Sequence, residues 1–328
     1  MTPGNRLAGG VLAGLLASCG GGGGGPTGPG SPPPVTGSTV SVIIFYDRNA
    51  NGVLEPGDHA IPDGDVVIAG KTAKSAVGSG AATVANVPAG THDVTLRAES
   101  VPPFFNVTTV PSVQAPSDAP VRIGLTLPIR NNRPDYYVAF GDSITRGEGV
   151  NAAQSYPARL QQRLAAHFGD AFVNNRGGDS TNSFEGVERF RRNVPANEPA
   201  YVLILYGTND WHDPACQAIT PQCQTVPNLR QMVRLARAEG TLPFLATIVP
   251  TNPALTPQGR NDWVDATNVA LKAMAAAEGA FVVDLNQAFK NQPNLPALFS
   301  DDVHPNAAGY DLIAQGFFEA IAHGRAVP

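Results

Sequence analysis

The spacing of hydrophobic positions divides this chain into two regions of different kinds. From residue 39 to about residue 127, short runs of β-prone residues are separated by turn residues, and no stretch has a helical period. The expected strands are 40–46, 66–68, 82–87, 92–98 and 121–127. Short strands separated by turns are typical of all-β sandwiches. We therefore predict a small antiparallel β-sandwich over residues 38–128.

After Pro134 the pattern changes, and apolar strands alternate with amphipathic helices. The expected strands are 136–140, 171–174, 201–206, 242–249 and 281–285, and helical periods lie near 154–167, 183–193, 226–239, 260–278 and 306–322. In the first helix, Leu160, Leu164 and Phe168 recur every four residues, which indicates one buried face. This alternation predicts a parallel sheet covered by helices on both faces, a three-layer α/β/α domain over residues 134–328.

The first 37 residues belong to neither region. An apolar stretch at 7–16 follows Arg6 and is too short to span a bilayer, so we predict a signal peptide over residues 1–19. Its end, Leu16-Ala17-Ser18-Cys19, resembles the lipobox of bacterial lipoproteins, which implies a lipid on Cys19. An ordinary signal peptide with a chance cysteine is the alternative. Residues 20–37 are rich in Gly, Pro and Ser and predict a disordered tether.

These features indicate a protein of the bacterial cell envelope, lipid-anchored at the outer membrane or surface, or else secreted. Charged residues make up 15% of the chain, the net charge is −5, and no basic run stands out, so a nucleic-acid partner is not expected. With Cys19 lipidated, Cys216 and Cys223 remain. Outside the cytoplasm such a pair predicts a disulfide that closes a small loop. Two metal-binding thiols are the alternative, but no second pair exists.

Residues suited to acyl transfer follow the expected strands of the second region. Ser143 lies in Gly-Asp-Ser just after the strand at 136–140, and near the C-terminus Asp301 precedes His304 by three residues. A serine hydroxyl becomes a nucleophile when an imidazole takes its proton and a carboxylate orients the imidazole. We therefore predict Ser143 as nucleophile, His304 as general base and Asp301 as its partner, with Asp302 as the rival partner.

Two further positions suit an oxyanion hole. Gly178 lies in a glycine turn after the strand at 171–174, and Asn209 lies in Gly-Thr-Asn-Asp after the strand at 201–206. Active sites of such sheets lie at the carboxyl ends of the strands, so Ser143, Gly178 and Asn209 are expected to lie near one another. Backbone N–H groups and side-chain amides there are suited to hold an oxyanion.

Together these motifs resemble the SGNH hydrolases, also called the GDSL esterase/lipase family. Ser143, Gly178, Asn209 and His304 match in order the four residues that name the family, within residues 134–325. The resemblance implies a flavodoxin-like fold and a serine esterase that forms an acyl-enzyme without a catalytic cofactor. It implies oxyanion donors on the backbone of Ser143 and Gly178 and on the side chain of Asn209. The second motif is shorter than usual in the family, so Gly177 is an alternative to Gly178.

The substrate class stays open at this stage. The resemblance allows acetylated carbohydrates, short acyl esters, lysophospholipids or thioesters, and a polysaccharide substrate suits a surface location with a non-catalytic sandwich. We expect a monomer. Trp211 and His212 are expected at the rim of the substrate cleft, and a plain surface loop is the alternative. One alternative function is an adhesion or scaffold lipoprotein with an inert hydrolase-like domain. Another is a metal hydrolase using Asp142, Asp210, Asp213 and His212, although their spacing matches no recognisable ligand set.

The sandwich resembles a collagen-adhesin B-type module and contains a loop with the spacing of an EF-hand. Oxygen ligands fall at positions 1, 3, 5, 7, 9 and 12 with glycine at position 6. The ligand residues are Asp47, Asn49, Asn51, Val53 (through its carbonyl), Glu55 and Asp58. We predict a structural calcium ion there. Asp in place of Glu at position 12 departs from the pattern, and a polar hairpin turn is the alternative.

Overall fold

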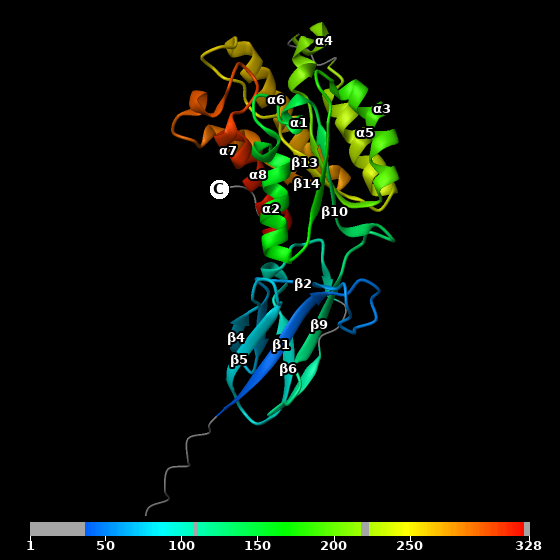
Figure 1. The fold of residues 1–328 in the computed structure, drawn as a ribbon, viewed down its shortest axis with the longest axis vertical. Coiled ribbons are helices and arrows are strands. Elements are labelled where there is room, and N and C mark those ends of the chain that lie inside the picture. Colours follow the sequence, from blue (N-terminus) through cyan, green and yellow to red (C-terminus); the bar gives the residue numbers. More distant parts are fainter. Residues whose placement is uncertain (1–36, 108–110, 218–222, 325–328) are drawn as a thin grey trace, which may run out of the picture. The chain divides into compact units, whose positions relative to one another are not determined.

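The structure is a computed structural model that describes residues 37–107, 111–217 and 223–324 (Figure 1). The expected signal peptide, Cys19 and residues 20–36 of the expected tether lie outside this part of the chain. Within the described ranges, no helix is both long enough and apolar enough to cross a membrane.

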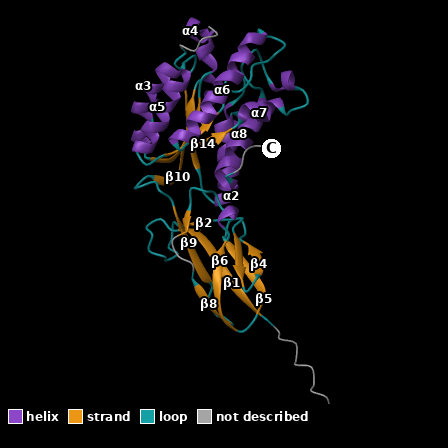
Figure 2. Ribbon diagram, turned by 180° about the vertical axis from the view of Figure 1, so that it is seen from behind, coloured by secondary structure: helices purple, strands orange, loops and turns teal. Residues whose placement is uncertain are grey.

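Residues 38–126 form two β-sheets (Figures 1 and 2). One sheet has the order β2-β1-β9-β7, with β5 also paired to β1, and the other has the order β4-β3-β6-β8. The strands are β1 (Ser38–Tyr46), β2 (His59–Ala60), β3 (Asp65–Ile68), β4 (Lys71–Lys74), β5 (Ala81–Val87), β6 (Gly90–Leu96), β7 (Asn106–Val107), β8 (Ser112–Ala115) and β9 (Val121–Thr126). In β5, Ala82, Val84 and Val87 are buried and the residues between them are exposed, which is the alternation of a half-buried strand.

The prediction of a wholly antiparallel sandwich is wrong for one strand pair. β1 runs parallel to β9, with Val42 opposite Val121 and Tyr46 opposite Leu125. Parallel neighbours require a long crossover, and the segment from β2 to β8 supplies it. The other pairs among the described residues of the two sheets are antiparallel.

The second region contains the predicted parallel sheet. Its order is β11-β10-β12-β13-β14, and each neighbouring pair is parallel. The strands are β10 (Arg133–Gly141), β11 (Phe172–Gly177), β12 (Pro199–Leu205), β13 (Leu242–Ala246) and β14 (Phe281–Val283). The chain places β11 on one side of β10 and then returns to place β12 on the other side. The carboxyl ends of β10 and β12 therefore flank a topological switch point, where ligands bind in such sheets.

Helices cover both faces of this sheet (Figure 1). They are α1 (Ser143–Arg146), α2 (Tyr156–Phe168), α3 (Ser183–Asn193), α4 (Pro214–Gln217), α5 (Thr225–Ala238), α6 (Gln258–Glu278), α7 (Leu285–Lys290) and α8 (Ala307–His323). Alternate residues of β10 point to opposite faces: Tyr137 and Ala139 share a core with α2 and α8, whereas Val138 and Phe140 share one with α3, α5 and α6. The three-layer prediction is thereby confirmed.

Phe104, from the segment between β6 and β7, packs against the sheet of the second region. Its ring centroid lies 6.0 Å from that of Tyr201, 5.8 Å from Phe244 and 5.3 Å from Phe281, each in an edge-to-face arrangement. Such aromatic contacts stabilise an interface beyond simple burial.

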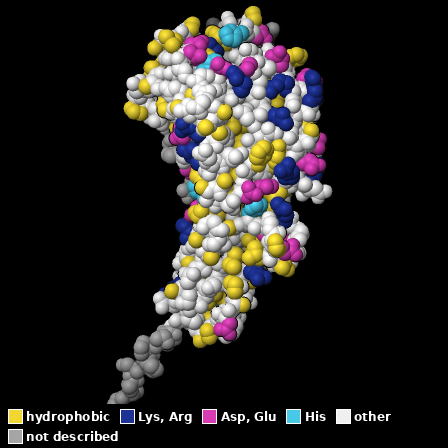
Figure 3. All heavy atoms as spheres, in the orientation of Figure 1, with side chains coloured by type: hydrophobic (Ala, Val, Ile, Leu, Met, Phe, Trp, Pro, Cys, Tyr) yellow, Lys and Arg dark blue, Asp and Glu magenta, His cyan; other side chains and the backbone are white. Residues whose placement is uncertain are grey.

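Charged side chains are spread thinly over the visible face (Figure 3), as a charged fraction of 15% requires.

Candidate active site

Ser143 is the first residue of α1 and follows β10 after a tight turn. The carboxylate of Asp142 caps the helix, with Oδ1 accepting the N–H of Ile144 at 2.9 Å. A Cβ at Gly141 would collide with the carbonyl oxygen of Leu205, so the turn requires glycine. Strand, glycine and cap together place Ser143 at the carboxyl end of β10.

Ser143, His304 and Asp301 form a continuous hydrogen-bonded chain. Oγ of Ser143 lies 2.9 Å from Nε2 of His304, and Nδ1 of His304 lies 2.7 Å from Oδ2 of Asp301. An ionised carboxylate can only accept, so Nδ1 donates to Asp301 and Nε2 is left to accept the hydrogen of Ser143. This is the arrangement in which an imidazole can remove the proton of a serine hydroxyl.

The two adjacent aspartates have different partners. Asp301 accepts hydrogen bonds through Oδ1 from the backbone N–H groups of Val303 (2.9 Å) and His304 (2.6 Å). Burial raises the pKa of Asp301, but the hydrogen bonds from the backbone and imidazole of His304 outweigh it, and the pKa lies below its ordinary value. Asp302 instead faces Arg260, with Oδ2 3.6 Å from Nη1. Asp301 is therefore ionised near neutrality and orients the imidazole.

Asn209 and the Ser143 backbone supply hydrogen-bond donors at the carboxyl ends of the neighbouring strands β12 and β10. Asn209 lies in the turn Thr208–His212 directly after β12, and its Nδ2 donates to the carbonyl of Thr181 at 3.0 Å. That bond uses one of two amide hydrogens and fixes the orientation of the other. The N–H of Ser143 opens a helix, where backbone donors have no partner within the helix. Both groups belong to the neighbouring ends of β10 and β12.

The expected oxyanion role of Gly178 is not visible in this geometry. Its N–H donates to the carbonyl of Gly141 at 3.0 Å, and the N–H of Gly177 donates to Oδ1 of Asn175 at 2.9 Å. A Cβ at Gly178 would collide with the guanidinium of Arg189, which explains the glycine by packing. An oxyanion role for either glycine stays a prediction.

Arg189 supports the site and was not expected from the sequence, where it reads as a surface residue of an amphipathic helix. It lies on α3 and donates to the carbonyls of Gly141 (3.0 Å) and Arg176 (2.7 Å), and also to the hydroxyl of Tyr206. These acceptors lie at the carboxyl ends of β11, β10 and β12. Arg189 therefore holds together the strand ends that carry the site. Its position three residues after the buried Gly186 places it on the buried face of α3, and this is the signal that could have revealed it.

The aspartates of the metal-hydrolase alternative have structural partners. Oδ1 of Asp210 accepts the N–H of Ser183, and Oδ2 accepts the hydroxyls of Ser183 and Thr225. Burial raises the pKa of Asp210 above its ordinary value and raises the pKa of Asp142 to about 7. Within the described ranges, Asp142, Asp210, Asp213 and His212 do not form a group close enough to share a metal ion. Asp142 and Asp210 instead hold the loops around the site.

Cys216 and Cys223 form a disulfide with a Cα–Cα distance of 4.5 Å. It joins α4 to the segment preceding α5, and residues 218–222 between them lie outside the described residues. Trp211, two residues after Asn209, is half-buried and packs against Trp263 of α6, with ring centroids 5.8 Å apart.

The loop expected to bind calcium folds back on its own carboxylates. Asp47 is buried and accepts the N–H groups of Asn51 (3.1 Å) and Gly52 (2.7 Å). Asp58 accepts the N–H groups of Glu55 (2.8 Å) and Arg48 (3.4 Å). Nδ2 of Asn49 donates to Glu55 and Oδ1 of Asn51 accepts from Val53. Side chains at alternating positions thus turn inward, and calcium binding stays a prediction.

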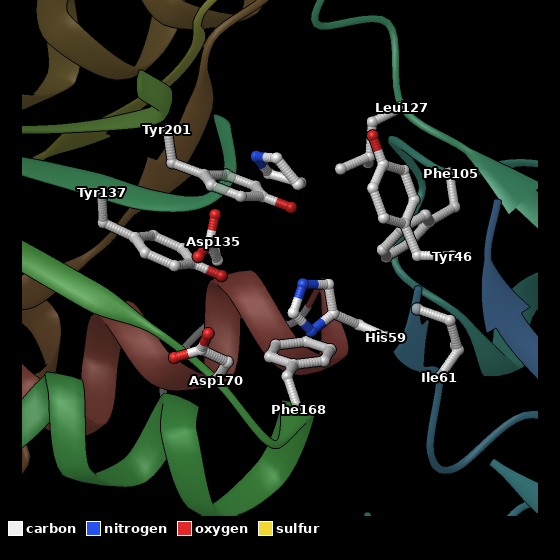
Figure 4. Close-up of a pocket in the computed structure, with 11 residues that line it drawn as sticks. Tyr46, His59, Ile61, Phe105, Leu127, Asp135, Tyr137, Phe168, Asp170 and Tyr201 are labelled. Atoms are coloured by element: carbon white, nitrogen blue, oxygen red, sulfur yellow. The ribbon is translucent and has the colours of Figure 1, made fainter. Parts of the chain in front are cut away.

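A small cavity lies between Phe105 and Leu127 on one side and Tyr137 and Tyr201 on the other (Figure 4). Its volume of about 20 Å³ is enough for a water molecule and too small for an ester. Tyr137 precedes the carboxyl end of β10 by four residues. The cavity therefore lies toward the amino ends of the strands, whereas Ser143 lies at their carboxyl ends.

The class of the protein follows from comparison with known families. A model of the GDSL-like lipase/acylhydrolase family matches residues 139–312, which is more than half of the chain. The chain belongs to this family. The predicted family is thereby confirmed, and with it the predicted class, the carboxylic ester hydrolases.

The chain is also similar to individual proteins of known sequence or structure. Esterase TesA of Pseudomonas aeruginosa is 32% identical over 143 residues, a match that covers 44% of this chain and 66% of that esterase, just under two thirds of its length. The lipase/acylhydrolase of Enterococcus faecalis is 24% identical with a TM-score of 0.49, covering 59% of this chain and 97% of that one. The acetylxylan esterase Axe2 of Geobacillus stearothermophilus is 21% identical with a TM-score of 0.49, covering 58% and 95%.

Proposed function

We propose that this protein hydrolyses carboxylic esters through an acyl-enzyme formed on Ser143. The observation that carries the proposal is the hydrogen-bonded chain from Asp301 through His304 to Ser143 at the carboxyl edge of the sheet. A buried hydroxyl needs a hydrogen-bond partner, but any single acceptor would satisfy it, so stability alone does not require an imidazole that is itself paired with a carboxylate. An imidazole held by a carboxylate on one nitrogen and by a serine on the other is suited to proton transfer.

Each step of the reaction uses a group already in place. Oγ of Ser143 attacks the ester carbonyl while its proton passes to Nε2 of His304, and the N–H of Ser143 and the free amide hydrogen of Asn209 stabilise the oxyanion. When the C–O bond to the alcohol breaks, His304 returns the proton to the leaving oxygen. Water, deprotonated by His304, then attacks the acyl group, and the Ser143 hydroxyl is restored as the acid leaves.

For the substrate we propose an acetylated carbohydrate, with short acyl or lipid esters as the competing class. Trp211, two residues after Asn209, and Trp263, which packs against it, support this choice, because half-buried indole rings present flat apolar faces with a polar edge. Sugar rings stack on such surfaces. The expected lipid anchor at Cys19 would place the enzyme at the bacterial envelope, where such polymers occur.

The test is a panel of purified acetylated oligosaccharides, p-nitrophenyl esters of increasing chain length and lysophospholipids. We expect the highest kcat/KM for acetyl esters of oligosaccharides. Trp211→Ala should raise KM for acetylated oligosaccharide and leave p-nitrophenyl acetate unaffected. The matched control is Phe172→Ala, an exposed aromatic at the start of β11, away from the carboxyl strand ends. A preference for long acyl chains would overturn the carbohydrate proposal while leaving ester hydrolysis intact.

Two further measurements test the chemistry and the location. A fluorophosphonate probe should label Ser143, and a folded protein that does not react would favour the inert scaffold instead. Mass spectrometry of the mature protein should find a diacylglyceryl cysteine at Cys19 as its first residue. An unlipidated N-terminus at another position would remove the membrane anchor from the proposal.

A further inference from the structure

Asp63, His167 and His323 form a cluster remote from the catalytic serine. Asp63 lies in the turn before β3 of the sandwich, His167 in the last turn of α2 and His323 at the end of α8. One nitrogen of each imidazole and one carboxylate oxygen of Asp63 lie within 4.8 Å of one another. Within the described residues, this is the grouping of His, Cys, Asp and Glu side chains that could share a metal ion.

His167 is the member that ordinary packing explains least. Its side chain is buried, and its Nε2 has no hydrogen-bond partner within the described part of the chain. Its ring centroid lies 5.4 Å from that of His323 and 5.4 Å from that of Phe318. Burial lowers the pKa of His167, which favours the neutral imidazole. A buried polar nitrogen without a partner is unfavourable unless something else binds it.

His323 is oriented by a carboxylate in the way that metal-binding histidines are. Its Nδ1 lies 2.8 Å from Oε2 of Glu319, one turn earlier on α8, and its Nε2 lies 3.6 Å from Oδ2 of Asp63. A carboxylate on one ring nitrogen fixes the tautomer and turns the other nitrogen toward a metal. The two carboxylates account for the contacts of His323, but within the described residues they leave Nε2 of His167 without a partner.

We propose that Asp63, His167 and His323 bind one zinc ion, with Glu319 as the residue that orients His323. Two imidazoles and a carboxylate are a ligand set that zinc accepts, and water can complete a tetrahedron. Ligand atoms at about 2.0–2.1 Å from zinc lie about 3.4 Å apart, so the three groups must approach by about 1.4 Å at most. The ring of His323 and the carboxylate of Asp63 are partly exposed and are free to make this movement.

A cavity gives access to the proposed zinc site, and zinc bound there would link two parts of the chain. A polar cavity of about 480 Å³ is lined by Asp63, Asp65, Lys74, Glu99, Ser100 and His323, which gives an ion a route from solvent. The ligands come from the sandwich and from two helices of the catalytic domain. Zinc would therefore connect the two domains and stabilise the folded chain, and it would take no part in the chemistry at Ser143.

The test is zinc binding to the full mature protein after extraction with a chelator and return to calcium-containing buffer. We expect isothermal titration calorimetry to find one Zn²⁺ per chain and the melting temperature to rise by about 5 °C at saturating zinc. Cobalt should bind to the same protein with the intense visible absorption of a tetrahedral site.

Two variants locate the ion. Asp63 has φ of +62°, a left-handed conformation that asparagine also tolerates, so Asp63→Asn should fold and bind zinc at least about tenfold more weakly. His323→Gln should lose the melting-temperature response. His92→Gln, which removes a histidine of β6, is the matched control and should respond like the wild type. No zinc response in the wild type, or an unchanged response in both site variants, would overturn the proposal.

Discussion

At the scale of single residues, the position of one hydrogen decides whether Ser143 is reactive. Asp301 accepts from Nδ1 of His304, so Nε2 is basic and lies 2.9 Å from Oγ of Ser143. Replacing Ser143 with alanine removes the nucleophile and leaves the buried turn intact. We expect Ser143→Ala to lower kcat for p-nitrophenyl acetate by at least about 10⁴-fold. The circular dichroism spectrum and melting temperature should be unchanged, and normal turnover by the variant would refute the nucleophile.

The adjacent aspartates give a matched pair of variants. Asp301→Asn keeps the shape of the side chain but offers an amide to Nδ1, which favours the wrong tautomer of His304. We expect kcat to fall by about 10³- to 10⁴-fold. Asp302→Asn alters a partly exposed contact with Arg260 and should change kcat less than about threefold. Steady-state kinetics of the two variants side by side decide the assignment, and equal losses would show that it is wrong.

Asp142 should make stability depend on pH in an unusual direction. Burial raises its pKa from 3.8 to about 7, so between these values the folded state binds more protons than the unfolded state. This contribution to stability is therefore full below about pH 4 and is lost as the pH rises through about 7. The slope is at most about 1.4 kcal/mol per pH unit.

Asp142→Asn should remove this slope, because the amide does not titrate and its oxygen can still cap Ile144. The measurement is urea unfolding of both proteins from pH 4 to pH 8. The difference in unfolding free energy should shift in favour of the variant as the pH rises. A difference that is constant with pH would show that Asp142 ionises normally in the folded protein.

Sequence motifs were enough to select the residues that meet in the candidate site, whereas the residues that pack around them could not be selected in this way. Ser143, Asn209 and His304 lie in short motifs whose chemistry is recognisable at fixed positions, and a spacing of three selects Asp301. Arg189 lies in no such motif. Its place on the buried face of α3 is a weak signal, and its acceptors, two backbone carbonyls and the hydroxyl of Tyr206, come from segments distant in sequence. The Gly178 assignment shows a related difficulty, since a side chain there would displace the guanidinium of Arg189 from its backbone acceptors, whether or not the N–H of Gly178 serves the oxyanion.

At the scale of elements, long periodic segments were predicted well and short ones were missed. The five strands and five helices expected in the catalytic domain are all present, with ends that differ by a few residues. α1, α4 and α7 were missed, because four to six residues do not complete two helical turns and show no period. Four strands of the sandwich, β2, β4, β7 and β8, have two to four residues each and were missed for the same reason. The parallel pairing of β1 with β9 depends on contacts distant in sequence.

The disulfide between α4 and α5 should stabilise this corner of the domain. It closes a short loop, for which the chain-entropy contribution is about 2–3 kcal/mol. We expect reduction to lower the unfolding free energy by that amount or less, measured by urea unfolding with and without reductant. The double variant Cys216→Ser, Cys223→Ser is the control and should match the reduced wild type. Insensitivity of the wild type to reductant would show that the bond contributes no stability.

At the scale of the whole molecule, the chain combines a catalytic domain with a sandwich that carries its own candidate ion site. In the sandwich loop, Asp47 and Asp58 each accept two backbone N–H groups, which holds their carboxylates in the interior of the loop. Calcium prefers such oxygen ligands, with six to eight around the ion. The catalytic residues lie at the carboxyl strand ends of the other domain, so calcium should act on stability and leave kcat unchanged.

We therefore expect calcium to raise the melting temperature of the chelator-treated protein by a few degrees and EGTA to reverse the effect. Asp47→Asn should abolish this response, because it removes the charge of the buried first ligand. Asp93→Asn, an exposed aspartate of β6, is the matched control. Asp63→Asn should keep the calcium response while losing affinity for zinc, which separates the two ions. If calcium does not change the melting temperature of the wild type, the loop is a hydrogen-bonded turn and not a calcium site. Its carboxylates already have backbone partners.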